Sequence, residues 1–137
     1  IIWTDANNHE YLEEAGTMNI FFKINNRLIT SPTNDRILDG ITRKSIIEIA
    51  KEKGIEVEER PIKIQELKQA HQNGTLEEVF GTGTAVVVLP IHRFSHQNQS
   101  YSLSEESPLA MELKNTLVQI QYNQSPDPFN WRHAVEL

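Results

Sequence analysis

Short apolar runs along the first half of the chain predict a series of β-strands. The clearest run covers residues 18–24, where the adjacent aromatic side chains of Phe21 and Phe22 favour a buried strand. Asn25 and Asn26 follow it, and because asparagine tolerates positive φ, this pair predicts a hairpin turn. The other strands that we expect here lie at residues 1–6, 11–14, 27–30 and 55–62.

Other segments repeat apolar residues at the spacing of a helix. The strongest begins near Thr42, which we expect to cap the helix, and ends at Gly54, a residue suited to the left-handed position after a helix. A shorter helix is predicted at residues 65–72 and a longer one at 108–121. The apolar stripe of the first helix comprises Ile46, Ile47, Ile49 and Ala50.

The remaining segments of the second half predict strands joined by loops. Residues 81–84 are expected to form a loop that leads into a buried strand at 85–89, and the polar segment 92–101 predicts a hairpin. The tail at 125–137 is expected to be irregular, with its aromatic residues as packing anchors. This order of strands and helices is typical of an α/β fold with α+β character.

Length, composition and charge narrow the classes of function. With 137 residues the chain can bury a core, and we expect residues 1–137 to form a single domain. The net charge of −6 argues against nucleic-acid binding, which needs a basic patch. The absence of cysteine excludes disulfides and thiolate metal sites, and it is compatible with the cytoplasmic location that we expect. No apolar run approaches the length of a membrane span, so we expect no membrane partner.

The first residues are apolar and suited to a strand, and no initiating methionine precedes them. Ile1, Ile2 and Trp3 lack the charged flank and the length of a signal peptide. We therefore expect the chain to be a fragment of a longer protein.

Residues 14–19 are the first of three segments that could form part of a functional site, and this segment begins with Glu14. Its carboxylate is followed by small residues and an apolar strand, so it would lie near a hydrophobic wall, where it could pair with a cationic ring nitrogen. The alternative is an exposed turn whose acid is solvated, and the residues alone favour that alternative.

A second segment, Gly40-Ile41-Thr42-Arg43, stands at the start of the strongest helix. A helix N-terminus presents free backbone N–H groups and the positive end of the helix dipole, so it binds phosphate well, and glycine lets a ligand approach closely. The alternative is that Thr42 is only a cap. Capping and phosphate binding do not exclude each other.

The third segment is the glycine-rich stretch at residues 81–85, whose backbone N–H groups could point at an anion. Its match to a dinucleotide fingerprint is weak, because that motif requires a helix after the glycines and β-branched residues follow here. The alternative is a turn that only connects strands. His92 and His96 need not share a face and lack an obvious third ligand, so no metal site is expected.

Together and in this order, the three segments resemble the fold-type-IV aminotransferases, and most closely the branched-chain-amino-acid aminotransferases. The matching stretches are Glu-Ala-Gly-Thr-Met-Asn-Ile-Phe-Phe at 14–22, Leu-Asp-Gly-Ile-Thr-Arg-Lys-Ser at 38–45 and Glu-Val-Phe-Gly-Thr-Gly-Thr-Ala at 78–85. The stretches at 120–122 and 127–131 are also similar to the C-terminal end of that family. The likeness therefore covers nearly the whole chain.

The resemblance implies a C-terminal, cofactor-binding domain with a mixed sheet or pseudo-barrel, packed helices and pyridoxal phosphate as cofactor. It implies that Glu14 pairs with the protonated pyridine nitrogen, which keeps the ring an electron sink, and that Thr17 lies near the phenolic oxygen. The backbone N–H groups of Ile41 and Thr42 would hold the cofactor phosphate, together with the hydroxyl group of Thr84.

The resemblance also implies where substrates bind and what the parent protein does. It implies that Gly40 and Gly83 also bind the cofactor, and that the N–H groups of Thr84 and Ala85 receive the substrate carboxylate. The implied reaction moves an amino group between leucine, isoleucine or valine and 2-oxoglutarate, as part of branched-chain amino-acid biosynthesis. The full-length protein would be a homodimer.

Two departures from the family pattern stand out. Some relatives carry a C-x-x-C pair after the Gly-Thr-Ala turn, where this chain has Val86 and Leu89, so no thiol switch exists. The lysine that attaches the cofactor covalently lies upstream in this family, and none of the lysines present matches its position. We therefore expect no catalytic residue in this chain and no activity of the fragment alone.

Alternative functions remain open at this level. A D-amino-acid aminotransferase or an aminodeoxychorismate lyase of the same fold is one alternative, although those relatives usually have Gly-Glu-Asn where this chain has Thr17, Met18 and Asn19. A non-catalytic α/β binding domain, with purely structural glycine turns, is the other.

Overall fold

Strand β3 (Met18–Ile24) is central to a seven-stranded mixed sheet in the computed structural model, which describes residues 1–137 throughout. One of its edges pairs with β6 (Leu76–Gly83), and the other pairs first with β2 (Leu12–Ala15) and then with β4 (Arg27–Thr30). The remaining strands β1 (Ile2–Thr4), β5 (Val57–Glu59) and β7 (Val87–Pro90) pair with β2, β4 and β6 respectively. Only the β4–β5 pair is parallel, so the expected mixed sheet is confirmed.

The hairpin turns follow from residues that adopt positive φ at low cost. Asn25 and Asn26 have φ values of 51° and 60°, which is the pattern of a type I′ turn and confirms the predicted hairpin between β3 and β4. Gly16 has φ 64° at the first position of the turn between β2 and β3, where a type II′ turn requires glycine. The two turns fix the register of β3 against both neighbours on one edge.

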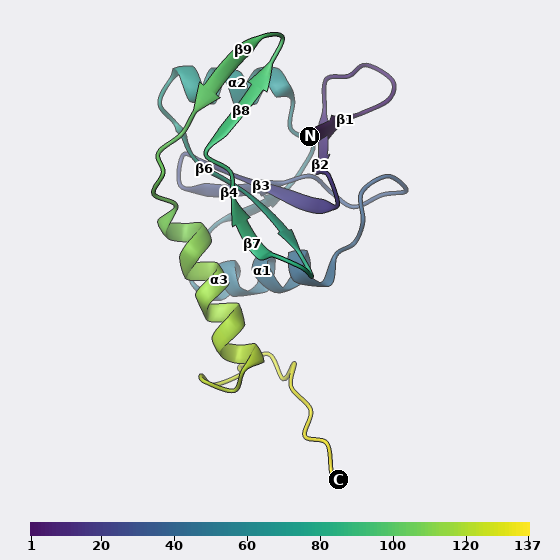
Figure 1. Ribbon diagram of the computed structural model, residues 1–137, viewed down its shortest axis with the longest axis vertical. Helices are drawn as coiled ribbons and strands as arrows, with labels where there is room; N and C mark the ends of the chain where they lie inside the picture. Colours follow the sequence, from purple (N-terminus) through teal and green to yellow (C-terminus); the bar gives the residue numbers. More distant parts are fainter.

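The sheet is covered on both faces, as Figure 1 shows. Helices α1 (Ile41–Glu52) and α3 (Pro108–Gln121) pack on one face, and the predicted apolar stripe of α1 is buried there. Helix α2 (Ile64–Gln72) and the hairpin of β8 (Arg93–His96) and β9 (Gln99–Ser102) cover the other face. The packed helices that we expected are thus confirmed. None of the helices is long and apolar enough to cross a membrane.

Strand β6 is the element that the hydrophobic pattern did not predict. Its second half carries Gly81 and Gly83, which lie in the paired strand rather than in the expected loop, and the turn falls at residues 84–86. The predicted strand at 85–89 is consequently shifted, because β7 begins at Val87. The predicted strand at 55–62 is shorter than expected, because only residues 57–59 pair with β4.

Buried Glu78 explains why the pattern of β6 is misleading. Its side chain is almost fully buried and accepts hydrogen bonds from the backbone N–H groups of Leu109 at 3.0 Å and Ala110 at 2.9 Å, at the start of α3. A carboxylate at a helix N-terminus satisfies donors that have no partner within the helix. A charged residue thus occupies an inward position of β6, and no local signal reveals it.

The C-terminal tail is irregular, as predicted, and its aromatic residues pack on the body of the protein. The rings of Phe129 and Trp131 stack with their centroids 4.3 Å apart and lie against the apolar cluster beneath α1 and α3. Beyond them the chain extends away from the sheet, as seen in Figure 1.

Candidate functional site

The candidate site lies where β2, β3 and β6 meet the start of α1. Glu14 on β2 is the direct pairing partner of Asn19 on β3, and Asn19 is in turn the partner of Thr82 on β6. Directly paired residues point to the same side of a sheet, so these side chains form one polar row. Glu14 is half-buried, whereas Asn19 and Thr82 are buried.

Two members of this row hold the peptide groups of Leu38, which lies three residues before the first residue of α1. The carboxylate Oε1 of Glu14 accepts a hydrogen bond from the Leu38 N–H at 2.8 Å. The amide Nδ2 of Asn19 donates to the Leu38 carbonyl, also at 2.8 Å. The approach to the helix is therefore fixed by side chains of the sheet.

Helix α1 begins without a side-chain cap. Its N-cap is Gly40, in extended conformation with φ −62° and ψ 135°, so the expectation that Thr42 caps the helix is wrong. The backbone N–H groups of Ile41, Thr42 and Arg43 donate to no acceptor in the protein. Free N–H groups at the positive end of a helix dipole suit an anion.

Gly40 occupies the N-cap because no larger residue fits. A Cβ atom on it would lie 2.3 Å from the Asn19 Oδ1 atom, far closer than two such atoms can approach. The same contact brings the helix start against β3. Close approach of the backbone, rather than an unusual φ, is therefore the reason for glycine at this position.

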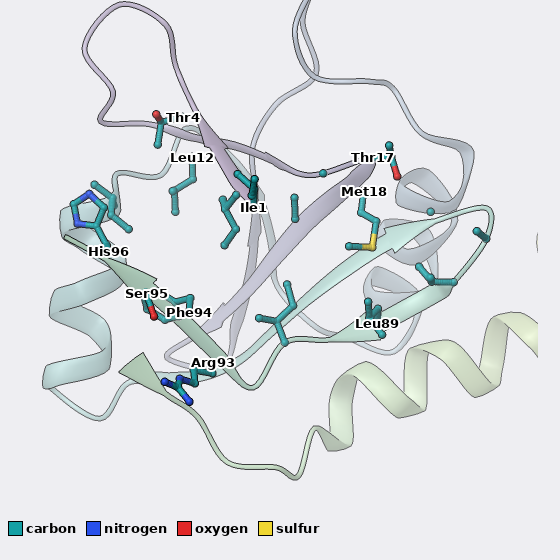
Figure 2. Close-up of a pocket in the computed structure, with 18 of the residues that line it drawn as sticks. Ile1, Thr4, Leu12, Thr17, Met18, Leu89, Arg93, Phe94, Ser95 and His96 are labelled. Atoms are coloured by element: carbon teal, nitrogen blue, oxygen red, sulfur yellow. The ribbon is translucent and has the colours of Figure 1, made fainter. Parts of the chain in front are cut away.

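The turn between β6 and β7 supplies a second set of free N–H groups. Thr84 and Ala85 are exposed, and their backbone N–H groups donate to no protein acceptor. Val87 directly after the turn has φ 61°, a conformation that costs a β-branched residue about 1–3 kcal/mol. In both Figure 1 and Figure 2 this turn lies beside the first turn of α1.

A cavity of about 830 Å³ opens on the other side of the same turn. Most of its lining is apolar, and its polar side chains include Thr17 and Thr84 near the turn and Arg93, Ser95 and His96 on β8. Figure 2 shows Thr17 and Met18 near Leu89 at one side of the cavity, and the side chains of β8 at the opposite side. A molecule at the turn would therefore meet polar groups at the turn, apolar side chains next to them and the polar side chains of β8 at the far side.

Side-chain cations near the helix start are already engaged. Lys44 pairs with Asp39 at 2.9 Å, and the buried guanidinium of Arg43 donates to the Ser31 carbonyl at 3.0 Å and to Glu59 at 2.8 Å. No cluster of residues that could hold a metal ion is present. The donors that remain open to an anion at this helix start are therefore chiefly its backbone N–H groups.

Comparison with known protein families decides what kind of protein this arrangement belongs to. Residues 1–94 match the family model described as amino-transferase class IV, which is more than half of the chain. This chain belongs to the class IV aminotransferase family.

Curated relatives and solved structures agree with that assignment. The chain is 44% identical over 137 residues to branched-chain-amino-acid aminotransferase 2 of Bacillus subtilis, covering 98% of this chain and 38% of the relative. It superimposes on the branched-chain amino acid aminotransferase of Escherichia coli with a TM-score of 0.77 at 29% identity, covering 95% of this chain and 40% of that one. A third match is a branched-chain amino acid aminotransferase from T.th. with pyridoxamine 5′-phosphate, with a TM-score of 0.74 at 26% identity. That match covers 91% of this chain and 38% of the other. The chain thus spans about two fifths of the relatives that it matches.

The structure of this class IV aminotransferase chain places the predicted site residues in connected groups. Glu14 and Gly40 are joined through Leu38 and Asn19. Thr17 adjoins Gly83, because a Cβ on that glycine would lie 3.8 Å from the Thr17 carbonyl oxygen. The predicted residues share the cavity only in part, since those that line it are Thr17, Gly83, Thr84 and Ala85.

Two residues of this site had no predicted role. Asn19 was part of a quoted motif, and its position opposite Glu14 in a hairpin was the signal that could have identified it. Leu38 is apolar yet 70% exposed, as is neighbouring Ile41 at 75%. Exposed apolar side chains on either side of Gly40 are a signal for a ligand surface, but it becomes visible only in the structure.

Proposed function

We propose that this chain is the C-terminal, cofactor-binding part of a branched-chain-amino-acid aminotransferase. The full-length protein would transfer an amino group between leucine, isoleucine or valine and 2-oxoglutarate, using pyridoxal phosphate. The observation that carries the proposal is the pair of uncapped N–H sites, at the start of α1 and at the β6–β7 turn, beside the Glu14 carboxylate. The names of the curated relatives support the substrate class. The cytoplasmic, biosynthetic homodimer implied by the resemblance belongs to the same proposal.

The residues present fit the phosphate of that cofactor. The N–H groups of Ile41 and Thr42 would hold the phosphate, because no side chain caps the helix and no protein acceptor occupies them. The hydroxyl group of Thr84 would add a further donor from the adjacent turn. A site built from fixed backbone dipoles keeps its geometry without reorganisation when the anion binds.

Glu14 and Leu38 fit the ring of the cofactor. Oε1 of Glu14 is held by the Leu38 N–H, while Oε2 has no partner in the protein and is free to face a protonated ring nitrogen. The exposed apolar side chains of Leu38 and Ile41 would pack against a planar ring. The bound cofactor would supply the electron sink for the reaction, and Glu14 would keep the ring nitrogen protonated.

The substrate would bind at the turn between β6 and β7. The N–H groups of Thr84 and Ala85 would receive its carboxylate, which fixes the orientation of the amino acid. Most of the lining of the adjoining cavity is apolar, with Arg93 and His96 at its far side, and the apolar part next to the turn suits an apolar side chain of the substrate. Proton transfer also requires a base. Lys44, the lysine that follows the start of α1, is paired with Asp39 and does not supply it. We assign that role to a lysine in the upstream part of the full-length protein.

Replacement of Glu14 in the full-length protein tests the proposal. Glu14→Gln should lower the rate of leucine transamination by about a hundredfold or more, because the amide cannot stabilise a protonated ring nitrogen. The matched control is Glu13→Gln, whose carboxylate pairs with Arg36 at 2.7 Å rather than with Leu38. Turnover of Glu14→Gln within a few-fold of the control would remove Glu14 from the site. The isolated 137-residue chain should form no glutamate above the rate of free cofactor.

A further inference from the structure

We propose that Asn19 is a positioning residue that sets the location of the anion-binding start of α1. It would control the affinity for a phosphate group without touching the phosphate. The inference rests on the proposed function, because it assumes that the free N–H groups of Ile41 and Thr42 receive that group. It adds a residue that acts through the protein backbone.

Both ends of the Asn19 amide contact the segment that leads into the helix. Nδ2 donates to the Leu38 carbonyl at 2.8 Å, and Oδ1 lies in the space where a side chain of residue 40 would begin. Asn19 itself is only 6% exposed. A buried amide that is hydrogen-bonded to Leu38 and packed close to Gly40 leaves the segment little freedom to move.

The support for this amide is rigid. Asn19 lies on β3, which pairs on one edge with Glu14 and on the other with Thr82. Loop segments are otherwise among the more mobile parts of a protein, and residues 31–40 form an irregular connection between β4 and α1. Asn19 therefore fixes the position of the last residues of the connection 31–40 relative to the sheet.

Glu14 makes the complementary contact from the neighbouring strand. Its carboxylate accepts from the Leu38 N–H, while Asn19 donates to the carbonyl of the same residue. The position of the phosphate site and the orientation of the proposed ring-nitrogen carboxylate are thus linked through one residue. Loss of the Asn19 amide removes one of these two attachments and leaves the other in place.

A comparison of two probes that differ by one phosphate group isolates the predicted effect. In the full-length protein, calorimetry measures the dissociation constants of pyridoxamine 5′-phosphate and of pyridoxamine, neither of which reacts with a lysine. The dissociation constant of pyridoxamine divided by that of pyridoxamine 5′-phosphate reports the contribution of the phosphate. Asn19→Ala should lower this ratio by about fivefold, the effect of losing about 1 kcal/mol of alignment. Asn19→Asp should lower it further, because an oxygen then faces the Leu38 carbonyl.

Thr30→Val is the matched control. Thr30 is also a buried residue of the sheet, and its hydroxyl donates to the Ile20 carbonyl at 2.7 Å, away from residues 38–40. The control should lose stability as Asn19→Ala does and keep the wild-type ratio. If Asn19→Ala and Asn19→Asp also keep the wild-type ratio, Asn19 has no positioning role. If the wild-type protein binds both probes equally, the proposed phosphate site itself is wrong, which is a different outcome.

Discussion

Gly40→Ala is the change that most directly probes the contact between β3 and the start of α1. The backbone of Gly40 has φ −62° and ψ 135°, which alanine adopts without strain, so any cost must come from its surroundings. The added Cβ would lie 2.3 Å from the Asn19 Oδ1 atom. Ordinary contact distances are about 1 Å longer, so either the Asn19 amide or the helix start must move.

The free energy of the change follows from three contributions. Overpacking a buried contact costs about 1–3 kcal/mol, and a swing of the amide also forfeits the Asn19–Leu38 hydrogen bond, which contributes about 1 kcal/mol. Alanine restricts the unfolded chain and returns about 0.4–1 kcal/mol. The net destabilisation is therefore about 2 kcal/mol, equivalent to a fall in Tm of roughly 5–10 °C for a chain of this size.

Urea denaturation of a double-mutant cycle measures this contribution. Gly40→Ala should cost about 2 kcal/mol in the wild-type background, and it should stabilise slightly, by about 0.4–1 kcal/mol, in an Asn19→Ala background, where the obstructing amide is gone. Gly83→Ala is the control, because its Cβ would meet the Met18 Cγ atom at an ordinary 3.6 Å. Equal costs of Gly40→Ala in the two backgrounds would refute the reasoning, since they would show that the amide is not the obstacle.

Two further predictions concern carboxylates that accept hydrogen bonds from backbone N–H groups. Glu78→Ala should lower the free energy of unfolding by about 2–4 kcal/mol, because it leaves two buried N–H donors at the start of α3 without an acceptor. Glu77→Ala, which loses a partly exposed ion pair, should cost less than about 1 kcal/mol, and equal costs in urea denaturation would contradict the capping role. The N–H groups of Asn8 and Tyr11 lower the pKa of Asp5 from 3.8 to about 2, so its stabilising contribution is complete above pH 3.8 and is lost as the pH falls through 2. Asp5→Asn should flatten the acid side of the stability curve, and parallel curves for the two proteins would exclude this.

The elements that the sequence predicts well are those whose signals are local. The strand at 18–24, the Asn25-Asn26 turn and the helix at 108–121 have the predicted bounds, because each combines a periodic apolar pattern with a suitable turn or terminus. Strand β6 lacked such a signal. Its inward-facing Glu78 is stabilised by a helix 31 residues away, a partner that no local window contains.

In the candidate site, too, the sequence predicts the local motif but not the contacts between residues that are far apart in the chain. Free N–H groups at the start of a helix follow from the glycine that begins it, and the motif could be located from sequence. The contacts that orient that motif connect residues separated by 19 and 24 positions, Asn19 with Leu38 and Glu14 with Leu38. Their existence depends on the pairing of β2 with β3, so only the folded structure reveals which side chains act as supports.

None of the three helices is capped by the side chain of its own N-cap residue, so what distinguishes α1 is the glycine at that position. Serine, threonine, aspartate or asparagine at an N-cap stabilises a helix by about 1 kcal/mol relative to alanine, because the side chain accepts one of the free N–H groups. Such a side chain at position 40 would occupy both the space taken by the Asn19 amide and the place where an anion meets the helix. Gly40 leaves both open. The contact with β3 therefore requires the same small residue that the proposed phosphate site needs, so the tests of Asn19 and of Gly40 address one and the same feature of the helix start.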